Sequence, residues 1–109
     1  MMVARQPPPI SVTTFATELN RYRVSNGYSI LTFEESLNDR ALQLAEKIDQ
    51  TGKADTSATI THQLDFTRSS GQLITDISRN TNDNDALLRS DISSAGFGMS
   101  KKTVVILLD

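Results

Sequence analysis

The chain has 109 residues, a formal net charge of −2 and no cysteine, which predicts one domain and excludes disulfides, thiolate metal sites and cysteine nucleophiles. Its charges are balanced, because residues 1–52 carry five basic and six acidic groups and residues 53–109 carry six and seven. This balance gives no electrostatic support to nucleic-acid binding, and no apolar stretch approaches the roughly 20 residues of a membrane span.

Residues 1–12 are predicted to be a tail, because Pro7, Pro8 and Pro9 favour polyproline II and forbid a helix before them. The tail lacks the apolar run of a secretory signal. The doubled methionine favours a native N-terminus, and the absence of disulfides favours a cytoplasmic protein. A secreted protein whose signal had been removed would have the same sequence, so that alternative stays open. Residues 13–109 are predicted to form the single domain.

The first helix is predicted over residues 13–25, with Thr13 or Thr14 as its cap. Asn26-Gly27 then supplies a left-handed exit from the helix. The helix carries an apolar stripe at helical spacing, which is made of Phe15, Leu19 and Tyr22.

The second helix is predicted to begin at a capping box and to end at Gly52. In the segment 32–35 (Thr-Phe-Glu-Glu), the threonine hydroxyl and the last carboxylate would satisfy each other's backbone donors. Gly52 provides a left-handed stop. Apolar residues recur along this helix and predict a buried stripe, formed by Phe33, Leu37, Ala41, Leu42, Leu44, Ala45 and Ile48.

The middle of the chain has weaker patterns. Residues 71–77 are predicted to be extended, and a short helix over residues 86–88 would be capped by Asn84 or Asp83 after an exposed polar segment. Alternation of apolar and polar residues also predicts a strand or an extended loop, with the alternate positions at Ala58, Ile60, His62 and Leu64.

The chain ends on a predicted hairpin, with strands over residues 95–99 and 103–108 and a turn at Ser100-Lys101-Lys102. The last strand is β-branched and continuously apolar, which is typical of a central strand that is buried on both faces. Since the helices are separated along the chain from the strands, the order of elements predicts the α+β class.

Two blocks of the sequence carry a family pattern. The first block is Leu19-Asn20-Arg21-Tyr22-Arg23, Gly27, Leu31, Leu37 and Ala41-Leu42-Gln43-Leu44-Ala45, and the second is Ala95-Gly96-Phe97-Gly98, a lysine turn and Val104-Val105-Ile106-Leu107-Leu108. Together they resemble the CAP superfamily of cysteine-rich secretory proteins, insect venom antigens and plant pathogenesis-related proteins. The resemblance implies an α-β-α sandwich with a small antiparallel sheet. It also implies a truncated domain, because the interval from Gly71 to Gly96 is shorter than is usual in the family.

The same resemblance implies where the family's pocket of two histidines and two acidic residues would lie. His62, the single histidine of the chain, falls at the place of the first family histidine. Gln72 stands where the family has a glutamate, and Asp83 falls near the place of the second histidine. These three residues are the predicted vestigial pocket. Since a catalytic metal needs about three protein ligands and an open position, no metal and no cofactor are predicted.

A serine nucleophile needs a base within hydrogen-bond reach and a third group that orients the base. Four serines could in principle partner His62, with Asp65 or Asp76 as the third group, and they are Ser69, Ser70, Ser93 and Ser94. Nothing in their spacing resembles a nucleophile elbow, so no catalytic residue is predicted.

The predicted function is therefore non-enzymatic binding on a degenerate CAP scaffold. A protein partner or self-association is the leading prediction, and the resemblance leaves lipid or sterol binding open. One alternative is a remnant metal-dependent hydrolase that uses His62. The other is a structural subunit of a larger assembly.

Overall fold

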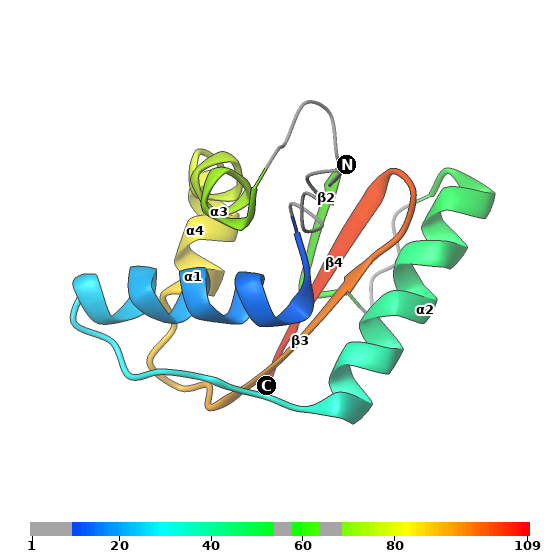
Figure 1. The fold of residues 1–109 in the computed structure, drawn as a ribbon. Helices are drawn as coiled ribbons and strands as arrows, with labels where there is room; N and C mark the ends of the chain where they lie inside the picture. The colour runs from blue at the N-terminus through cyan, green and yellow to red at the C-terminus, as the bar shows by residue number, and fades with distance from the viewer. Residues whose placement is uncertain (1–9, 54–57, 64–68) are drawn as a thin grey trace, which may run out of the picture.

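The structure, a computed structural model, describes residues 10–53, 58–63 and 69–109. Figure 1 shows three layers, in which a sheet lies between helices on both faces. One face is covered by α2 (Glu35–Thr51), and the other face is covered by α1 (Val12–Ser25), α3 (Ser70–Ser78) and α4 (Thr81–Leu87). The predicted α+β class and the α-β-α sandwich are confirmed.

The sheet has four strands in the order β1 (Thr32–Phe33), β3 (Ser94–Met99), β4 (Thr103–Leu108) and β2 (Ile60–Gln63). The β3–β4 and β4–β2 pairs are antiparallel, whereas β1 runs parallel to β3. The sheet is therefore mixed, and the prediction of a purely antiparallel sheet is wrong at this one edge. The reason is that the chain runs from β1 directly into α2 and forms no hairpin with β3.

The last strand is central, as predicted. Val104 and Ile106 belong to the core beneath α1, α3 and α4, whereas Val105 and Leu107 belong to the core beneath α2. Because successive side chains of a strand point to opposite faces, this continuous apolar run fills both cores. On the first of the two faces, Phe15 of α1 stacks on Phe97 of β3 with ring centroids 4.4 Å apart.

Helix α1 begins slightly earlier than predicted and is capped by Ser11. The Ser11 Oγ accepts a hydrogen bond from the Thr14 amide at 3.2 Å, and the Thr14 Oγ1 accepts one from the Ser11 amide at 2.9 Å. The predicted caps Thr13 and Thr14 are wrong, because Ser11 is the residue with extended backbone before the helix. Gly27 confirms the left-handed exit with a φ of +84°. Ile10 is buried, and residues 1–9 of the predicted tail lie outside the described residues.

The predicted capping box at residues 32–35 is wrong. Thr32 and Phe33 form β1, and the Glu34 side chain, at the cap position of α2, makes no capping hydrogen bond. Pairing with β3 overrides the local pattern, since the Thr32 amide donates to the Ser93 carbonyl at 2.9 Å and the Glu34 amide donates to the Ala95 carbonyl at 3.0 Å. At the other end of α2, Gly52 has a φ of +70° and closes the helix as predicted.

The middle of the chain is more helical than predicted. The segment predicted to be extended over residues 71–77 is helix α3, which Ser69 caps by accepting a hydrogen bond from the Gln72 amide at 3.1 Å. The apolar residues of this segment also fit one face of a helix, and Leu73, Ile74 and Ile77 are all buried.

The next helix, α4, begins earlier than predicted, and Asn80 caps it by accepting a hydrogen bond from the Asp83 amide at 3.1 Å. Asp83 and Asn84 are therefore inside the helix, and the prediction that either one caps it is wrong. The predicted strand before these helices is β2, and the predicted position Leu64 lies outside the described residues.

Two glycines of β3 let helix α2 pack closely on the sheet. A Cβ atom at Gly96 would overlap the backbone of Leu37, and one at Gly98 would overlap the backbone of Ala41 and Leu42. Side chains at these two positions would therefore push α2 away from the strand. The pattern Gly-x-Gly thus has a packing role here.

Candidate functional site

The structure brings two of the three predicted pocket residues near each other. His62 lies on β2 opposite Val104 of β4, and Asp83 lies on the short helix α4; both are half-buried. Burial raises the pKa of the Asp83 carboxyl, and the charge of the nearby His62 acts in the opposite direction. Gln72 lies on an exposed position of α3.

The pair His62 and Asp83 supplies two potential ligands. Among the residues that the structure describes, no group of three or more histidine, aspartate and glutamate side chains is arranged to hold a metal ion. Within the same residues, no helix has both the length and the apolar character to cross a membrane.

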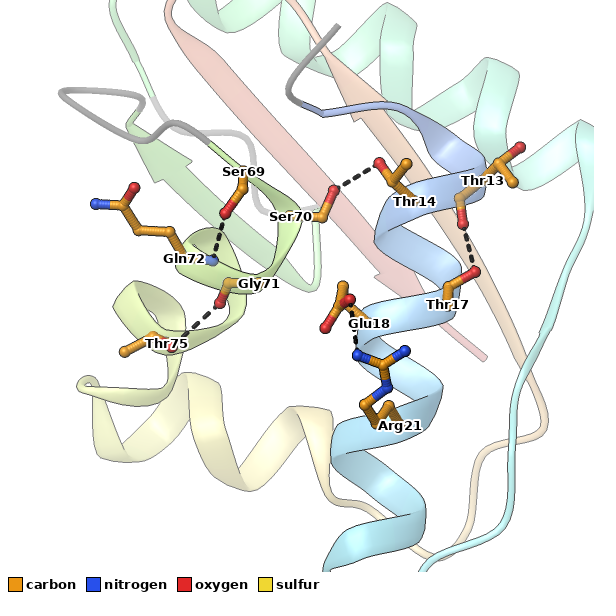
Figure 2. Close-up of polar contacts among 10 residues, drawn as sticks. All are labelled: Thr13, Thr14, Thr17, Glu18, Arg21, Ser69, Ser70, Gly71, Gln72 and Thr75. Carbon is orange, nitrogen blue, oxygen red and sulfur yellow. Dashed lines mark hydrogen bonds and ion pairs between the residues drawn. The ribbon is translucent and has the colours of Figure 1, made fainter. Parts of the chain in front are cut away.

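The serines at the start of α3 have structural partners. Ser69 caps the helix, and the buried Ser70 forms a hydroxyl–hydroxyl hydrogen bond of 2.7 Å with Thr14 of α1 (Figure 2). Figure 2 also shows the exposed ion pair between Arg21 and Glu18 of α1, with a nitrogen–oxygen distance of 3.2 Å. A groove of about 310 Å³ lies beside these helices and is lined by Glu18, Arg21, Tyr22, Ser25, Gly71, Ile74 and Thr75.

Arg23 is a buried cation that the sequence analysis did not identify. Its side chain is only 1% exposed, and its Nε donates to the Ser29 carbonyl at 2.8 Å. One of its terminal nitrogens donates to the carbonyls of Leu87 at 2.7 Å and Arg89 at 3.0 Å. Burial lowers the pKa of the guanidinium, and an electrostatic contribution from Tyr28 opposes this shift. Arg23 therefore joins the end of α1 to the end of α4.

Asn20 has a similar role one turn earlier. Its side-chain amide donates to the Leu31 carbonyl at 3.1 Å, and its Oδ1 accepts from the Leu31 amide at 2.8 Å. Asn20 and Arg23 thus hold the connection between α1 and β1. The only signal for these roles in the sequence was the resemblance of this block to the family pattern.

An apolar groove lies between α1, α2 and β3 and is our candidate binding site. Its volume is about 260 Å³, and it is lined by Ser11, Val12, Asn38, Asp39, Leu42, Phe97, Gly98 and Met99. Leu42 was predicted to be in the buried stripe of α2, but its side chain is 40% exposed. Asn38 fixes one side of the groove, since its Oδ1 accepts a hydrogen bond from the Phe97 amide at 2.9 Å.

Asp49, near the end of α2, holds the turn between β3 and β4. Its carboxylate accepts hydrogen bonds from the Ser100 hydroxyl, from the Thr103 hydroxyl at 2.6 Å and from the Lys102 amide at 3.3 Å. The Ser100 hydroxyl, followed by that of Thr103, holds the pKa of Asp49 below its usual value.

These contacts predict a pH-dependent effect of Asp49→Asn. A carboxyl whose folded pKa is lowered stabilises the folded state above its unfolded pKa of about 3.9, and this contribution is lost as the pH falls through the folded pKa. Thermal unfolding should therefore show a lower Tm for Asp49→Asn at pH 7, and the difference should shrink below about pH 4. Asp85→Asn, at an exposed position of α4, is the control. A difference that stays constant down to pH 3 would contradict this role of Asp49.

Several solved structures share the fold. An outer surface protein from Borrelia burgdorferi superposes with a TM-score of 0.68 at 15% identity, over 88% of this chain and 89% of that chain. An extracellular protein containing an SCP domain from Bacillus anthracis gives 0.73 at 10% identity, over 88% of this chain and 39% of that chain. A cysteine-rich secretory protein from Staphylococcus aureus gives 0.72 at 13% identity, over 90% and 38%.

The chain has a CAP-like fold, and the resemblance predicted from the sequence is confirmed at this level. It spans nearly the whole Borrelia chain but about two fifths of the Bacillus and Staphylococcus chains. No protein-family model matches the sequence, and no curated protein matches it either. At these identities the similarity concerns the fold alone.

Proposed function

We propose that this protein is a non-enzymatic binding module that acts by protein–protein interaction. The observation that supports this most directly is the apolar groove between α1, α2 and β3, with the partly exposed Leu42 at its wall. Burying the exposed part of one leucine and its neighbours against a partner would contribute on the order of 1 kcal/mol per side chain. A groove with apolar walls and a polar rim is typical of an interaction site.

The pocket residues support binding rather than catalysis. His62 and Asp83 make two potential ligands, whereas a catalytic metal needs about three and an open position. The hydroxyl of the buried Ser70 is hydrogen-bonded to the Thr14 hydroxyl, so this serine has a structural partner. The remnant hydrolase therefore has less structural support than the binding module.

We expect zinc and copper titrations of the wild type and of His62→Ala to give the same isotherm. The physical reason is that the pair His62 and Asp83 is one ligand short of a stable site. Calorimetry of both proteins at pH 7 measures this directly. A saturable isotherm that disappears in His62→Ala would contradict the proposal and favour the metal-dependent alternative.

The groove volumes bear on the lipid alternative. Small-molecule sites usually enclose about 300–1,000 Å³ and bury most of their ligand. The apolar groove has about 260 Å³, and the groove beside α1 and α3, at about 310 Å³, carries the charged Glu18 and Arg21 on its wall. The first groove is smaller than this range, and the second is at its lower limit with a charged wall, so both suit one or two side chains of a partner better than a sterol. Fluorescent sterol and fatty-acid probes are therefore expected to show no saturable binding.

The location of the protein is part of the same proposal. Two of the structural neighbours are described as an outer surface protein and an extracellular protein. These descriptions favour the secreted alternative for this chain over the cytoplasmic one.

A further inference from the structure

The outer edge of β3 is paired along only part of its length. The parallel strand β1 reaches Ser94 and Ala95, and the next residue after β1, Glu34, donates its amide to the Ala95 carbonyl at 3.0 Å. The chain then turns into α2. In the described part of the chain, no strand pairs with this edge over residues 96–99.

The hydrogen bonds on the other side of β3 show which groups point to this edge. Ser94 exchanges two hydrogen bonds with Asp109, of 3.0 and 2.9 Å, and the Ser100 amide donates to the Thr103 carbonyl at 2.8 Å. In an antiparallel pair such residues alternate with residues whose amide and carbonyl point away. Phe97 and Met99 therefore direct their backbone groups to the outer edge.

One of these groups is already satisfied, because the Phe97 amide donates to Asn38. The Phe97 carbonyl and the Met99 amide have no hydrogen-bond partner among the residues that the structure describes. Phe97 and Met99 both line the 260 Å³ groove, and Leu42 lines it as well. An acceptor and a donor two residues apart on one strand edge are what an added extended segment uses.

The charged residue that lines the groove, Asp39, is acidic. The exposed Glu35 and Glu46 lie on the same stripe of α2 as Asp39 and Leu42, at spacings of three, four and seven residues, and Glu46 also lines a neighbouring groove together with Lys101. The basic residues Arg40 and Lys47 of α2 lie off this stripe, two before and five after Leu42. The charge at the groove therefore complements a cationic segment and opposes a second copy of the same acidic stripe.

We propose that the outer edge of β3 binds an extended, cationic segment of a partner protein by strand addition. The Phe97 carbonyl and the Met99 amide hold its backbone, an apolar side chain contacts Leu42, and a lysine or arginine faces Asp39. This inference rests on the proposed function and names the kind of partner. The shortness of β1 leaves this edge open, because a longer β1 would pair with residues 96–99 of β3.

The test uses the full chain and a labelled hexapeptide, Lys-Lys-Val-Val-Lys-Lys, because each face of this extended peptide carries one valine between two lysines. Fluorescence anisotropy should show saturable binding, which Asp39→Lys and Leu42→Ser each weaken at least about tenfold. The matched controls Asp85→Lys and Val24→Ser, at exposed positions outside the groove, should bind like the wild type. A peptide with glutamate in place of lysine, and one with alternate amides N-methylated, should bind at least about tenfold more weakly. Equal binding by all variants, or no binding by the wild type, would overturn the inference.

Amide hydrogen exchange gives a second readout that does not depend on any variant. The peptide should slow exchange of the Met99 amide at least tenfold, with a smaller change at Gly98, whose amide points to β4. An unchanged Met99 amide would overturn the inference. Protection of the Met99 amide in the free protein would also overturn it, because the chain would then cover its own edge. A dimer of the free protein that Leu42→Ser dissociates would overturn it too, because a second copy would then occupy the edge. If the peptide fails to bind and the metal isotherms of the wild type and His62→Ala are identical, this inference is wrong and the proposed function stands. If metal binding depends on His62, the proposed function is wrong, and the hydrogen-exchange measurement at Met99 still tests the strand edge.

Discussion

Gly98→Ala is expected to destabilise the protein by about 3 kcal/mol, the upper part of the range for overpacked sites. The added Cβ would overlap backbone atoms of Ala41 and Leu42, which no side-chain rotation can relieve. Helix α2 would have to move away from β3, and the core formed by Ala41, Ala45 and Val105 would open. Because a domain of this size has a free energy of unfolding of about 5–15 kcal/mol, the loss should be evident in urea unfolding.

Gly71→Ala is the matched control for this substitution. Gly71 lies inside α3, and a Cβ there would meet the Glu18 carboxylate at 3.6 Å, an ordinary contact. Since alanine favours a helix over glycine, this variant should be as stable as the wild type or more stable by roughly 0.5–1 kcal/mol. If Gly98→Ala and Gly71→Ala unfolded at the same urea concentration, the result would contradict the close packing of α2 on β3.

Arg23→Met is expected to cost about 3 kcal/mol as well, for an electrostatic reason. Methionine fills much of the volume but donates nothing to the carbonyls of Ser29, Leu87 and Arg89, and leaving a buried acceptor unsatisfied costs about 1–3 kcal/mol. Thermal unfolding should report a Tm lower by about 10 °C or more.

Arg21→Met provides the comparison on the same helix. Arg21 is exposed, and its surface ion pair with Glu18 should contribute at most about 1 kcal/mol. The prediction is therefore a large difference between two arginine substitutions only two residues apart. Equal losses of stability for the two variants would contradict the assignment of Arg23 as the link between the ends of α1 and α4.

The residues of the family pattern have structural roles, whereas the residues of the groove have the proposed binding role. Gly98 and Arg23 both belong to the blocks that resemble the CAP superfamily, and both have packing or hydrogen-bonding explanations. The features that support binding, by contrast, are Leu42 and the unpaired groups of Phe97 and Met99. The resemblance therefore concerns mainly the scaffold. The binding role of the groove is tested by the peptide experiment on this chain.

Local patterns were sufficient for several elements of the fold. The helix α2 with buried Ala41, Ala45 and Ile48, the left-handed glycines Gly27 and Gly52 and the continuous apolar run of β4 were each predicted correctly. Each of these signals arises from residues within one or two turns of each other, or from a strand buried on both faces. The α+β class followed from their order.

Contacts between distant segments explain what was missed. The predicted capping box at residue 32 does not form, because this segment pairs with Ser93 and Ala95, about sixty residues away. Leu42 fits the apolar stripe of α2, yet it is partly exposed because the edge beside it is unpaired beyond Ala95. Periodicity tells which residues share a face, but burial and strand pairing depend on which other segments reach that face, and that information is absent from any short stretch of sequence.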